Sequence, residues 1–396
     1  MKDKKLNIAV NARHLIPNKM EGIGWFSYQM MKRITQNHPD VHFYFLFDRS
    51  FDSQVIFSDN ITPIILLPPA RHPLLIYYWN EFSVPNLLNK LNPDVYVSLD
   101  GFISKRAKYK QYAVIHDLNF LVYPEYLSWG LRKLYNYFFV KHIHHTNRIA
   151  TVSEFSKSEI IKYLHFPEDK IDVIFNASNL KLREIRDSEE IQIKNEYTNG
   201  KDYFIYVSSI HPRKNVTGVI KAFNLYKEKT KSEDKLVLVG RFFWKKDEVT
   251  TLVNESPFKQ DIVLTGRLDD DTILVLMKFA KALLMVSHYE GFGVPVIEAM
   301  QLGTPVITSN TTSLNEIAGD AAIKVSPKNI EEIAQAMQTI NDNKELVNNL
   351  IIKGKIQSQK FNWDDLSERL WQGILKTIEE KHYCPKCFLK LYEKYQ

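Results

Sequence analysis

Short apolar runs of strand length alternate with longer segments of helical character along the chain. In the first half the runs cover residues 6–10, 41–47, 61–67, 94–98, 112–115, 148–152 and 171–174, and in the second half residues 203–207, 235–240, 262–265, 282–286 and 305–308. This alternation is typical of a parallel sheet with helices on both faces. We therefore predict an α/β fold in which ligands bind beyond the carboxyl ends of the strands.

The length and composition indicate two globular domains. A chain of 396 residues with 44% hydrophobic and 25% charged residues can fill two cores of ordinary size, and it does not have the composition of a disordered or fibrous protein. We expect a first domain at residues 1–180, a second at 181–363, and a final helix with a tail at 364–396. The charge-rich residues 179–202 are interpreted as the linker.

The N-terminus carries no recognisable targeting segment. The apolar run at residues 6–10 is too short for the core of a signal peptide. No run in the chain approaches the roughly 18 apolar residues that a membrane helix needs. We therefore expect the protein to stay in the cytoplasm.

The net charge of +6 fits anionic partners such as phosphorylated ligands or a lipid surface. No nucleic-acid-binding motif accompanies it, so we expect no nucleic-acid partner. The chain has two cysteines, Cys384 and Cys387, which form a C-x-x-C with only His382 nearby. Because structural zinc takes four ligands, we interpret them as reduced thiols without function, with a metal bridge between two chains as the alternative.

A strand, a turn and a helix are predicted around residues 287–300. The apolar run 282–286 leads into the turn, and Pro295 suits the first turn of a helix. Gly303 suits the left-handed position that follows a helix. The run at residues 305–308 then completes a βαβ unit.

The turn of this unit combines glycines with two carboxylates. Backbone amides at Gly291 and Gly293, together with the helix N-terminus, favour a phosphate. Glu290 then faces whatever is attached to that phosphate. Glu298 lies near the same crevice, where it can accept hydrogen bonds from sugar hydroxyls. A strand-to-helix turn with two solvated glutamates is the alternative.

Charged residues follow two other runs of the second half. Arg213 and Lys214 come after residues 203–207, and adjacent cations at a strand-to-helix turn suit a diphosphate, although solvated surface charges would give the same pattern. Residues 269–271 are three aspartates. They would fit a D-x-D metal site, but we interpret them as caps of a helix N-terminus, and we expect no metal.

Two strand ends in the first half also carry candidate residues. Gly22 and Gly24 lie in a loop before a helix at residues 26–34, and this loop could cradle an anion. The loop is long and lacks a third glycine, which disfavours a dinucleotide site. His116 follows the run 112–115, where its ring can point into the crevice. A structural histidine is the alternative.

Residues 129–142 mix aromatic and basic side chains. One interpretation is a buried helix that fills the core of the first domain. The other is an interfacial surface that holds the domain against an anionic membrane or a lipid-linked acceptor.

Taken together, the run Glu290-Gly291-Phe292-Gly293-Val294-Pro295-Val296-Ile297-Glu298 resembles the E-x7-E signature of retaining glycosyltransferases of the GT-B fold, known as family 4. Residues 264–268 and 303–310 also match the usual sequence of that family. The resemblance implies two Rossmann-like domains that face each other across a cleft, with the final helix crossing back to the first. It places the nucleotide sugar in the second domain and the acceptor in the first.

The resemblance also assigns roles to individual residues. Lys214 matches the lysine of the family at this position, and Arg213 takes the place of an arginine that is replaced here by Ser209. His116 matches a His-Asp pair of the active site, so His116 and Glu290 are the expected catalytic residues. The expected donor-binding residues are Gly22, Gly24, Arg213, Lys214, Gly266, Arg267, Leu268, Gly291, Phe292, Gly293 and Glu298.

The sequence thus predicts a retaining, metal-independent hexosyltransferase that needs no cofactor. Its donor would be a UDP, GDP or dTDP sugar, and its acceptor a glycan or a polyprenyl-linked sugar in cell-surface polysaccharide biosynthesis. An anionic membrane surface is a further expected partner. A nucleotide-sugar epimerase of the same fold is the alternative, and a two-domain sugar-binding protein without chemistry is a third candidate.

Overall fold

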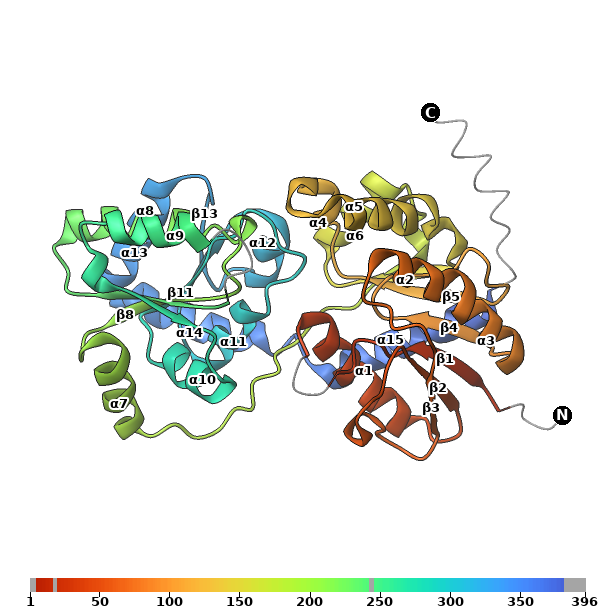
Figure 1. Cartoon of the computed structure of the whole chain (residues 1–396). Coiled ribbons are helices and arrows are strands. Elements are labelled where there is room, and N and C mark those ends of the chain that lie inside the picture. The colour runs from red at the N-terminus through yellow and green to blue at the C-terminus, as the bar shows by residue number, and fades with distance from the viewer. Residues whose placement is uncertain (1–4, 17–19, 242–245, 381–396) are drawn as a thin grey trace. The chain divides into compact units, whose positions relative to one another are not determined.

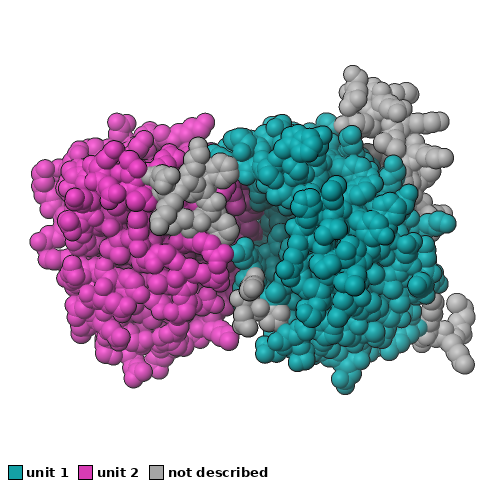
Figure 2. All heavy atoms as spheres, in the orientation of Figure 1, with its two compact units in different colours: residues 1–176, 363–396 teal, residues 177–362 magenta. Residues whose placement is uncertain are grey.

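The computed structural model describes residues 5–16, 20–241 and 246–380. It divides into two compact units, which Figure 2 shows in different colours. Unit 1 contains the described residues up to Asn176 and those from Trp363 onward, and unit 2 contains residues 177–362. Cys384 and Cys387 lie outside the described residues.

Unit 1 is built on a seven-stranded parallel sheet (Figure 1). Its strands are β1 (Asn7–Asn11), β2 (His42–Phe47), β3 (Ile61–Ile65), β4 (Val95–Ser98), β5 (Gln111–Ile115), β6 (Arg148–Thr151) and β7 (Ile171–Val173). Their order across the sheet is β3-β2-β1-β4-β5-β6-β7, and in the register Ala9 lies opposite Tyr44 and Tyr96. The strands are apolar on both faces because helices cover both.

The helices of unit 1 lie on both sides of this sheet (Figure 1). The first helix, α1 (Gly22–Asn37), and the last, α15 (Trp363–Glu379), pack together, and α15 lies over β4, β5 and β6. Phe26, Met30 and Ile34 recur at four-residue intervals on the buried face of α1. The opposite side of the sheet carries α2 (Pro73–Tyr78), α3 (Val84–Leu91), α4 (Asn119–Val122), α5 (Trp129–Tyr135) and α6 (Glu154–Leu164).

Unit 2 repeats this architecture with six parallel strands in the order β10-β9-β8-β11-β12-β13. They are β8 (Tyr203–Val207), β9 (Lys235–Val239), β10 (Ile262–Gly266), β11 (Ala282–Met285), β12 (Val306–Ser309) and β13 (Ile323–Val325). One face carries α8 (Val216–Thr230), α9 (Lys246–Glu255) and α13 (Ile330–Asp342). The other carries α7 (Asp187–Thr198), α10 (Asp270–Lys278), α11 (Val294–Leu302) and α14 (Lys344–Ser358), and α12 (Thr312–Ala318) follows β12.

The prediction of two doubly wound parallel-sheet domains is confirmed, with three local corrections. The charged segment 179–202 is not only a linker, because residues Asp187–Thr198 form α7, which packs on α10. Gly22 and Gly24 belong to the first turn of α1 and not to a loop. The strand β13 was not predicted. In the part of the chain that the structure describes, no helix is long and apolar enough to cross a membrane.

Both sheets reverse their winding at the same place. In unit 1 the strand order changes direction between β1 and β4, and in unit 2 between β8 and β11. The loops that follow two such strands diverge to opposite faces, and the crevice between them is where open α/β sheets bind ligands. Each unit therefore has one switch point to inspect for a site.

Candidate functional site

Hydrogen bonds fix the loops after β8 and β11 to each other in unit 2. Asn215 has a left-handed backbone, with φ of 60°, and its Nδ2 donates to the carbonyl oxygens of Val286 (2.9 Å) and Pro327 (2.7 Å). The backbone N–H of His288 donates to the carbonyl oxygen of Arg213 (2.8 Å). These bonds hold the two loops at the switch point and so position the side chains that they carry.

Lys214 and Glu290 form an ion pair between these two loops. Arg213 Nη1 lies 3.5 Å from Glu290 Oε2, and Ser287 Oγ donates to Glu290 Oε1 over 3.0 Å. The side chains of Lys214 and Glu290 are only 10% and 7% exposed. Buried charges need partners, and the structure supplies them by bringing three of the predicted site residues into one cluster.

The two cations decide the protonation of this cluster. Burial alone would raise the pKa of Glu290, but the charges of Lys214 and Arg213 outweigh it, so the pKa is lowered. Burial and the same two cations lower the pKa of His211 to about 4, which leaves that ring neutral. The cluster therefore holds two cations against one carboxylate, an excess of positive charge that suits a diphosphate.

The turn that leads into α11 depends on Gly293. Its φ is 111°, and a Cβ there would lie 2.5 Å from Leu314 Cδ2, so a larger residue would strain the backbone and clash. Ser313 Oγ bridges the carbonyl oxygens of Glu290 (2.8 Å) and Phe292 (2.9 Å). Gly293 brings no side-chain cap to α11. Pro295 has no N–H and the N–H of Val296 donates to the carbonyl oxygen of Gly293 (3.0 Å), so the N–H of Val294 is the amide of the first turn that a ligand can use.

Glu298, in the second turn of α11, has a different environment from Glu290. Burial, with a contribution from Asp270, raises the pKa of Glu298 to about 7, although the carboxyl accepts a bond from the backbone N–H of Asn179. The group can therefore be protonated or ionised near neutral pH. Either form can bond to hydroxyls of a ligand.

The residues predicted near the nucleotide base lie at the end of β10 and directly after it. Gly266 has a φ of 73°, and the Arg267 side chain beside it is exposed. Gly266, Arg267 and Leu268 lie at the carboxyl edge of the sheet, where β9 and β8 separate β10 from β11. Asp269 accepts the N–H of Thr272 (2.9 Å), which confirms the capping interpretation of residues 269–271. Within residues 5–16, 20–241 and 246–380, no group of three potential metal ligands occurs.

In unit 1, His116 lies at the carboxyl end of β5. Its Nε2 is 3.0 Å from the carbonyl oxygen of Leu99, so this nitrogen carries the proton and donates. The ring packs edge-on against Phe26, with centroids 5.0 Å apart. Burial lowers the pKa of His116. The bond to Leu99 and the nearby charge of Asp117 raise the pKa, but by less than burial lowers it. A neutral ring leaves Nδ1 as an acceptor for a hydroxyl.

The two glycines of α1 differ in their surroundings. A Cβ on Gly24 would lie 2.9 Å from the carbonyl oxygen of His14 and 3.2 Å from the Met20 side chain, so the helix approaches the preceding loop closely there. A Cβ on Gly22 would meet nothing within 4 Å. Of the two, Gly22 has the space for a ligand beside it.

Residues 129–142 combine buried and exposed side chains. Leu134, Phe138 and Phe139 are buried in the core of unit 1. Trp129 is 73% exposed, and Lys133 Nζ lies 3.9 Å from the centroid of its ring. The segment thus fills the core with one side and presents an aromatic and basic surface with the other.

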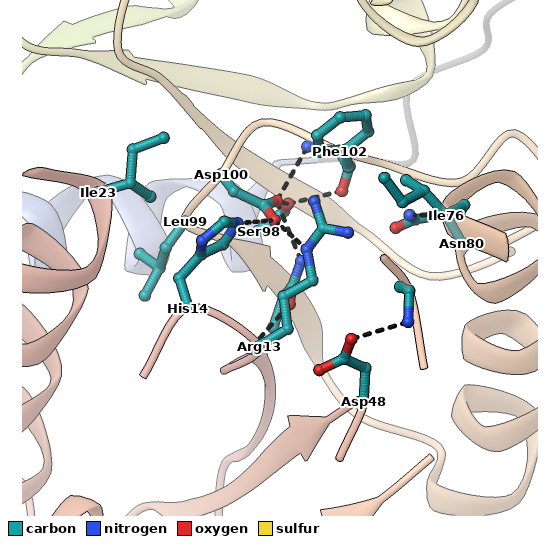
Figure 3. Close-up of polar contacts among 12 residues, drawn as sticks. Arg13, His14, Ile23, Asp48, Ile76, Asn80, Ser98, Leu99, Asp100 and Phe102 are labelled. Atoms are coloured by element: carbon teal, nitrogen blue, oxygen red, sulfur yellow. Dashed lines mark hydrogen bonds and ion pairs between the residues drawn. The ribbon is translucent and has the colours of Figure 1, made fainter. Parts of the chain in front are cut away.

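Sequence reasoning missed a polar cluster at the switch point of unit 1 (Figure 3). Arg13 follows β1, Asp100 follows β4, and Arg13 Nε donates to Asp100 Oδ2 over 2.6 Å. His14 Nε2 lies 3.2 Å from the same oxygen. The available signal was the position of these charged residues directly after apolar runs, which is where the ligand-binding edge of a parallel sheet begins.

Two family models match the chain, one over each half. The model described as Glycosyltransferase Family 4 matches residues 20–182, and the model described as Glycosyl transferases group 1 matches residues 187–357. The second match includes Lys214, Glu290 and Glu298.

Similar proteins are known by sequence and by structure. The O-antigen chain mannosyltransferase B of Escherichia coli is 26% identical over 87% of this chain and 93% of its own length. Sucrose-phosphate synthase from Thermosynechococcus elongatus has a TM-score of 0.73 at 18% identity and covers 94% of this chain and 99% of its own. HepE of Anabaena, solved with UDP-glucose, has a TM-score of 0.69 at 15% identity, over 94% and 100% of the two chains. At such identities the two structures establish the fold.

Proposed function

The chain belongs to the group 1, family 4 glycosyltransferases of the GT-B fold, and we propose that it moves a hexose from a nucleotide diphosphate sugar to a glycan or lipid-linked acceptor. The pathway proposed is the synthesis of a cell-surface polysaccharide, because a relative that matches most of the chain is an O-antigen mannosyltransferase. Mannose is therefore the first sugar to test. Family membership favours transfer over the epimerase alternative.

The observation that carries this proposal is the cluster of Lys214, Arg213 and Glu290 beside the N-terminus of α11. Its excess positive charge and the N-terminus of α11 are suited to the diphosphate of the donor. Glu298, further along the same helix, is suited to the ribose hydroxyls. HepE was solved with UDP-glucose, which supports a nucleotide sugar as the donor.

We assign the chemistry to preorganised charges and not to a metal. Lys214, Arg213 and the N-terminus of α11 would stabilise the departing diphosphate, while Glu290 orients the sugar. The acceptor oxygen would attack the anomeric carbon on the face from which the phosphate leaves, and the acceptor proton would pass to a phosphate oxygen. The anomeric configuration is then retained. His116, with Nδ1 as an acceptor, would contact the transferred sugar or its phosphate.

The test is transfer from GDP-mannose and from UDP and dTDP sugars to a glycan acceptor, with NMR of the product's anomeric centre in the presence and absence of EDTA. We expect retention of configuration and no effect of EDTA. An inverted product, or activity that returns only with Mn²⁺, would contradict the mechanism. Release of isomerised donor without any acceptor would instead favour an epimerase. Thermal stabilisation by each nucleotide identifies the base beforehand.

A further inference from the structure

The switch points of the two units carry the same kind of ion pair. In unit 2 a cation from the loop after β8, Lys214, pairs with a carboxylate from the loop after β11, Glu290. In unit 1 Arg13, after β1, pairs with Asp100, after β4. The strands β1 and β8 hold the third place in their sheets, and β4 and β11 hold the fourth. Unit 1 therefore has a charged site in the position that holds the predicted donor site in unit 2.

The carboxylate of this second pair is fully satisfied by its neighbours. Asp100 Oδ1 accepts hydrogen bonds from Ser98 Oγ (2.9 Å), Asn11 Nδ2 (3.0 Å) and the backbone N–H of Phe102 (3.2 Å). Its Oδ2 faces Arg13 Nε (2.6 Å) and His14 Nε2 (3.2 Å). The side chain of Asp100 is 2% exposed. Because its charge is spread over five donors, Asp100 does not need the rest of the Arg13 guanidinium.

Arg13 keeps donors that nothing in the described structure uses. Its side chain is 6% exposed, and its Cζ lies 4.7 Å from the centroid of the Phe102 ring, which supports one face of the guanidinium. Only Nε bonds to Asp100, and neither η nitrogen has a hydrogen-bond partner among the residues described. In Figure 3 one η nitrogen of Arg13 extends away from Asp100. A planar pair of η nitrogens held in this way is suited to the oxygens of a phosphate.

An acceptor on Asn80, unpaired among the described residues, limits which ligands would fit this site. Asn80 donates from Nδ2 to the carbonyl oxygen of Ile76 (2.9 Å), and its buried Oδ1 has no partner within the described part of the chain. Figure 3 shows the Asn80 amide on the side toward which the Arg13 guanidinium extends. A fully ionised phosphate brings no donor for Oδ1, whereas a phosphate ester that carries a hydroxyl group brings both an anion for Arg13 and a donor for Asn80.

We infer that Arg13 and Asn80 form a binding site in unit 1 for a phosphate that bears hydroxyl groups, as part of the acceptor. That the ligand is an acceptor depends on the proposed function. That a phosphate binds here depends only on the geometry of Arg13. Two sources share this chemistry, a free polyol phosphate and the headgroup of a lipid.

Arg49 supplies the matched control. It also follows a strand of unit 1, but its Nε and Nη2 both bond to the two carboxylate oxygens of Asp48, each over 2.6 Å, so its outer edge is already used. Asp48, like Asp100, is buried. Arg49→Lys and Arg13→Lys each replace a guanidinium that bonds to a buried aspartate, while only Arg13→Lys removes the proposed ligand contact.

The test is calorimetry of the full chain with glycerol phosphate, with short-chain dioctanoyl phosphatidylglycerol, and with glycerol, each in the presence of saturating GDP or UDP. We expect glycerol phosphate or the lipid to bind to the wild type at least ten times more tightly than glycerol. Arg13→Lys should remove this preference, and Arg49→Lys should keep it. Binding of glycerol phosphate points to a free acceptor, and binding of the lipid alone points to a headgroup.

Equal binding of all three probes to the wild type would overturn the inference without any variant. Equal losses in Arg13→Lys and Arg49→Lys would overturn it as well, because the effect would then be one of stability. Failure of the proposed function has a separate signature. In that case no nucleotide sugar is turned over, whether or not Arg13 binds the phosphate probes.

Discussion

Lys214 and Glu290, 76 positions apart in the chain, neutralise each other in the site predicted to hold the donor. The diphosphate of a nucleotide sugar carries the same sign of charge as this carboxylate. Binding of the donor must therefore share the cation or replace its partner. The ion pair keeps Lys214 oriented toward the proposed position of the diphosphate before the donor arrives, at the cost of competition from Glu290.

Replacing Lys214 by alanine should weaken the binding of a nucleoside diphosphate by roughly 1.5–3 kcal/mol, the range for a charge-assisted hydrogen bond. Isothermal calorimetry measures this directly. The control is Lys281→Ala, because Lys281 pairs with the buried Asp234 at 2.7 Å and is not part of the site. Both variants should lose stability, but only Lys214→Ala should lose affinity. If Lys214→Ala binds the nucleoside diphosphate with the same dissociation constant as the wild type, Lys214 does not belong to the donor site.

Replacing Glu290 by glutamine should separate turnover from binding. The neutral amide no longer competes for Lys214 and Arg213, so affinity for the nucleoside diphosphate should stay the same or rise. Turnover should fall by about 10²-fold, the range for one preorganised polar group in a site. Initial rates together with calorimetry check both values. A variant with normal turnover would show that Glu290 does not orient the sugar.

The pH dependence of nucleotide binding should report on Glu298. Its pKa is raised to about 7, so at pH 6 the carboxyl is mostly protonated before the nucleotide binds. Ribose hydroxyls that donate to the carboxylate would favour the ionised form. We expect binding to release a proton below pH 7 and affinity to rise from pH 6 to pH 8. Calorimetry in buffers of different ionisation enthalpy detects the proton, and an affinity that is flat across this range in the wild type would refute the contact.

Glu298 also makes a prediction about stability without any ligand. Its pKa in the folded chain lies above its ordinary value of 4.5, so the unfolded chain loses this proton first as the pH rises. The residue therefore lowers stability progressively between pH 4.5 and about 7 and keeps the full penalty above that range. Glu298→Gln should be roughly 2 kcal/mol more stable than the wild type at pH 8, and nearly equal at pH 4.

Urea unfolding at the two pH values measures the difference. The matched control is Glu228→Gln, since Glu228 is an exposed carboxylate on α8 of the same unit. This control should show no comparable change between pH 4 and pH 8. If Glu298→Gln and Glu228→Gln behave alike, the environment described for Glu298 is wrong.

The exposed side of residues 129–142 should bind an anionic membrane. Exposed Lys133 and Arg132 would each contribute about 1 kcal/mol near such a surface, and Trp129 would insert its ring. We expect the wild type to sediment with anionic vesicles at low salt and the double variant Trp129→Ala, Lys133→Glu to sediment less. Ile352→Ala, Lys353→Glu on α14 is the control, because it removes one exposed apolar and one basic residue elsewhere. If the wild type does not sediment with these vesicles, the segment contributes only to the core of unit 1.

The sequence was sufficient for most of the strands and for the turn before α11. Long apolar runs bounded by glycine and proline leave little choice of structure, and Pro295 and Gly303 mark the helix ends where the structure has them. The strand β13 escaped because its three residues, Ile323–Val325, are too few to form a pattern. The helix α7 escaped because it is mostly polar, and only Ile193 and Thr198 of it are buried.

Contacts between distant positions could not be read from the sequence. Arg13 and Asp100 are separated by 87 positions, and nothing in either neighbourhood indicates the other. The same holds for Ser313, which bridges the carbonyl oxygens of Glu290 and Phe292 from the next crossover. Such pairs follow only from the strand order, which local patterns do not determine.

Helix α15 makes unit 1 discontinuous in sequence, which affects its assembly on the ribosome. This helix supplies Trp363, which packs edge-on against Phe26, and Trp371, which stacks on His38 with ring centroids 4.1 Å apart. Residues 177–362 must be translated between the rest of unit 1 and this helix, which takes roughly 10–40 s at typical rates of synthesis. Unit 2 can fold in that interval, while the face of β4, β5 and β6 that α15 covers stays exposed. The domain that starts first is completed last, so nascent chains that stall after unit 2 expose an apolar sheet face to chaperones.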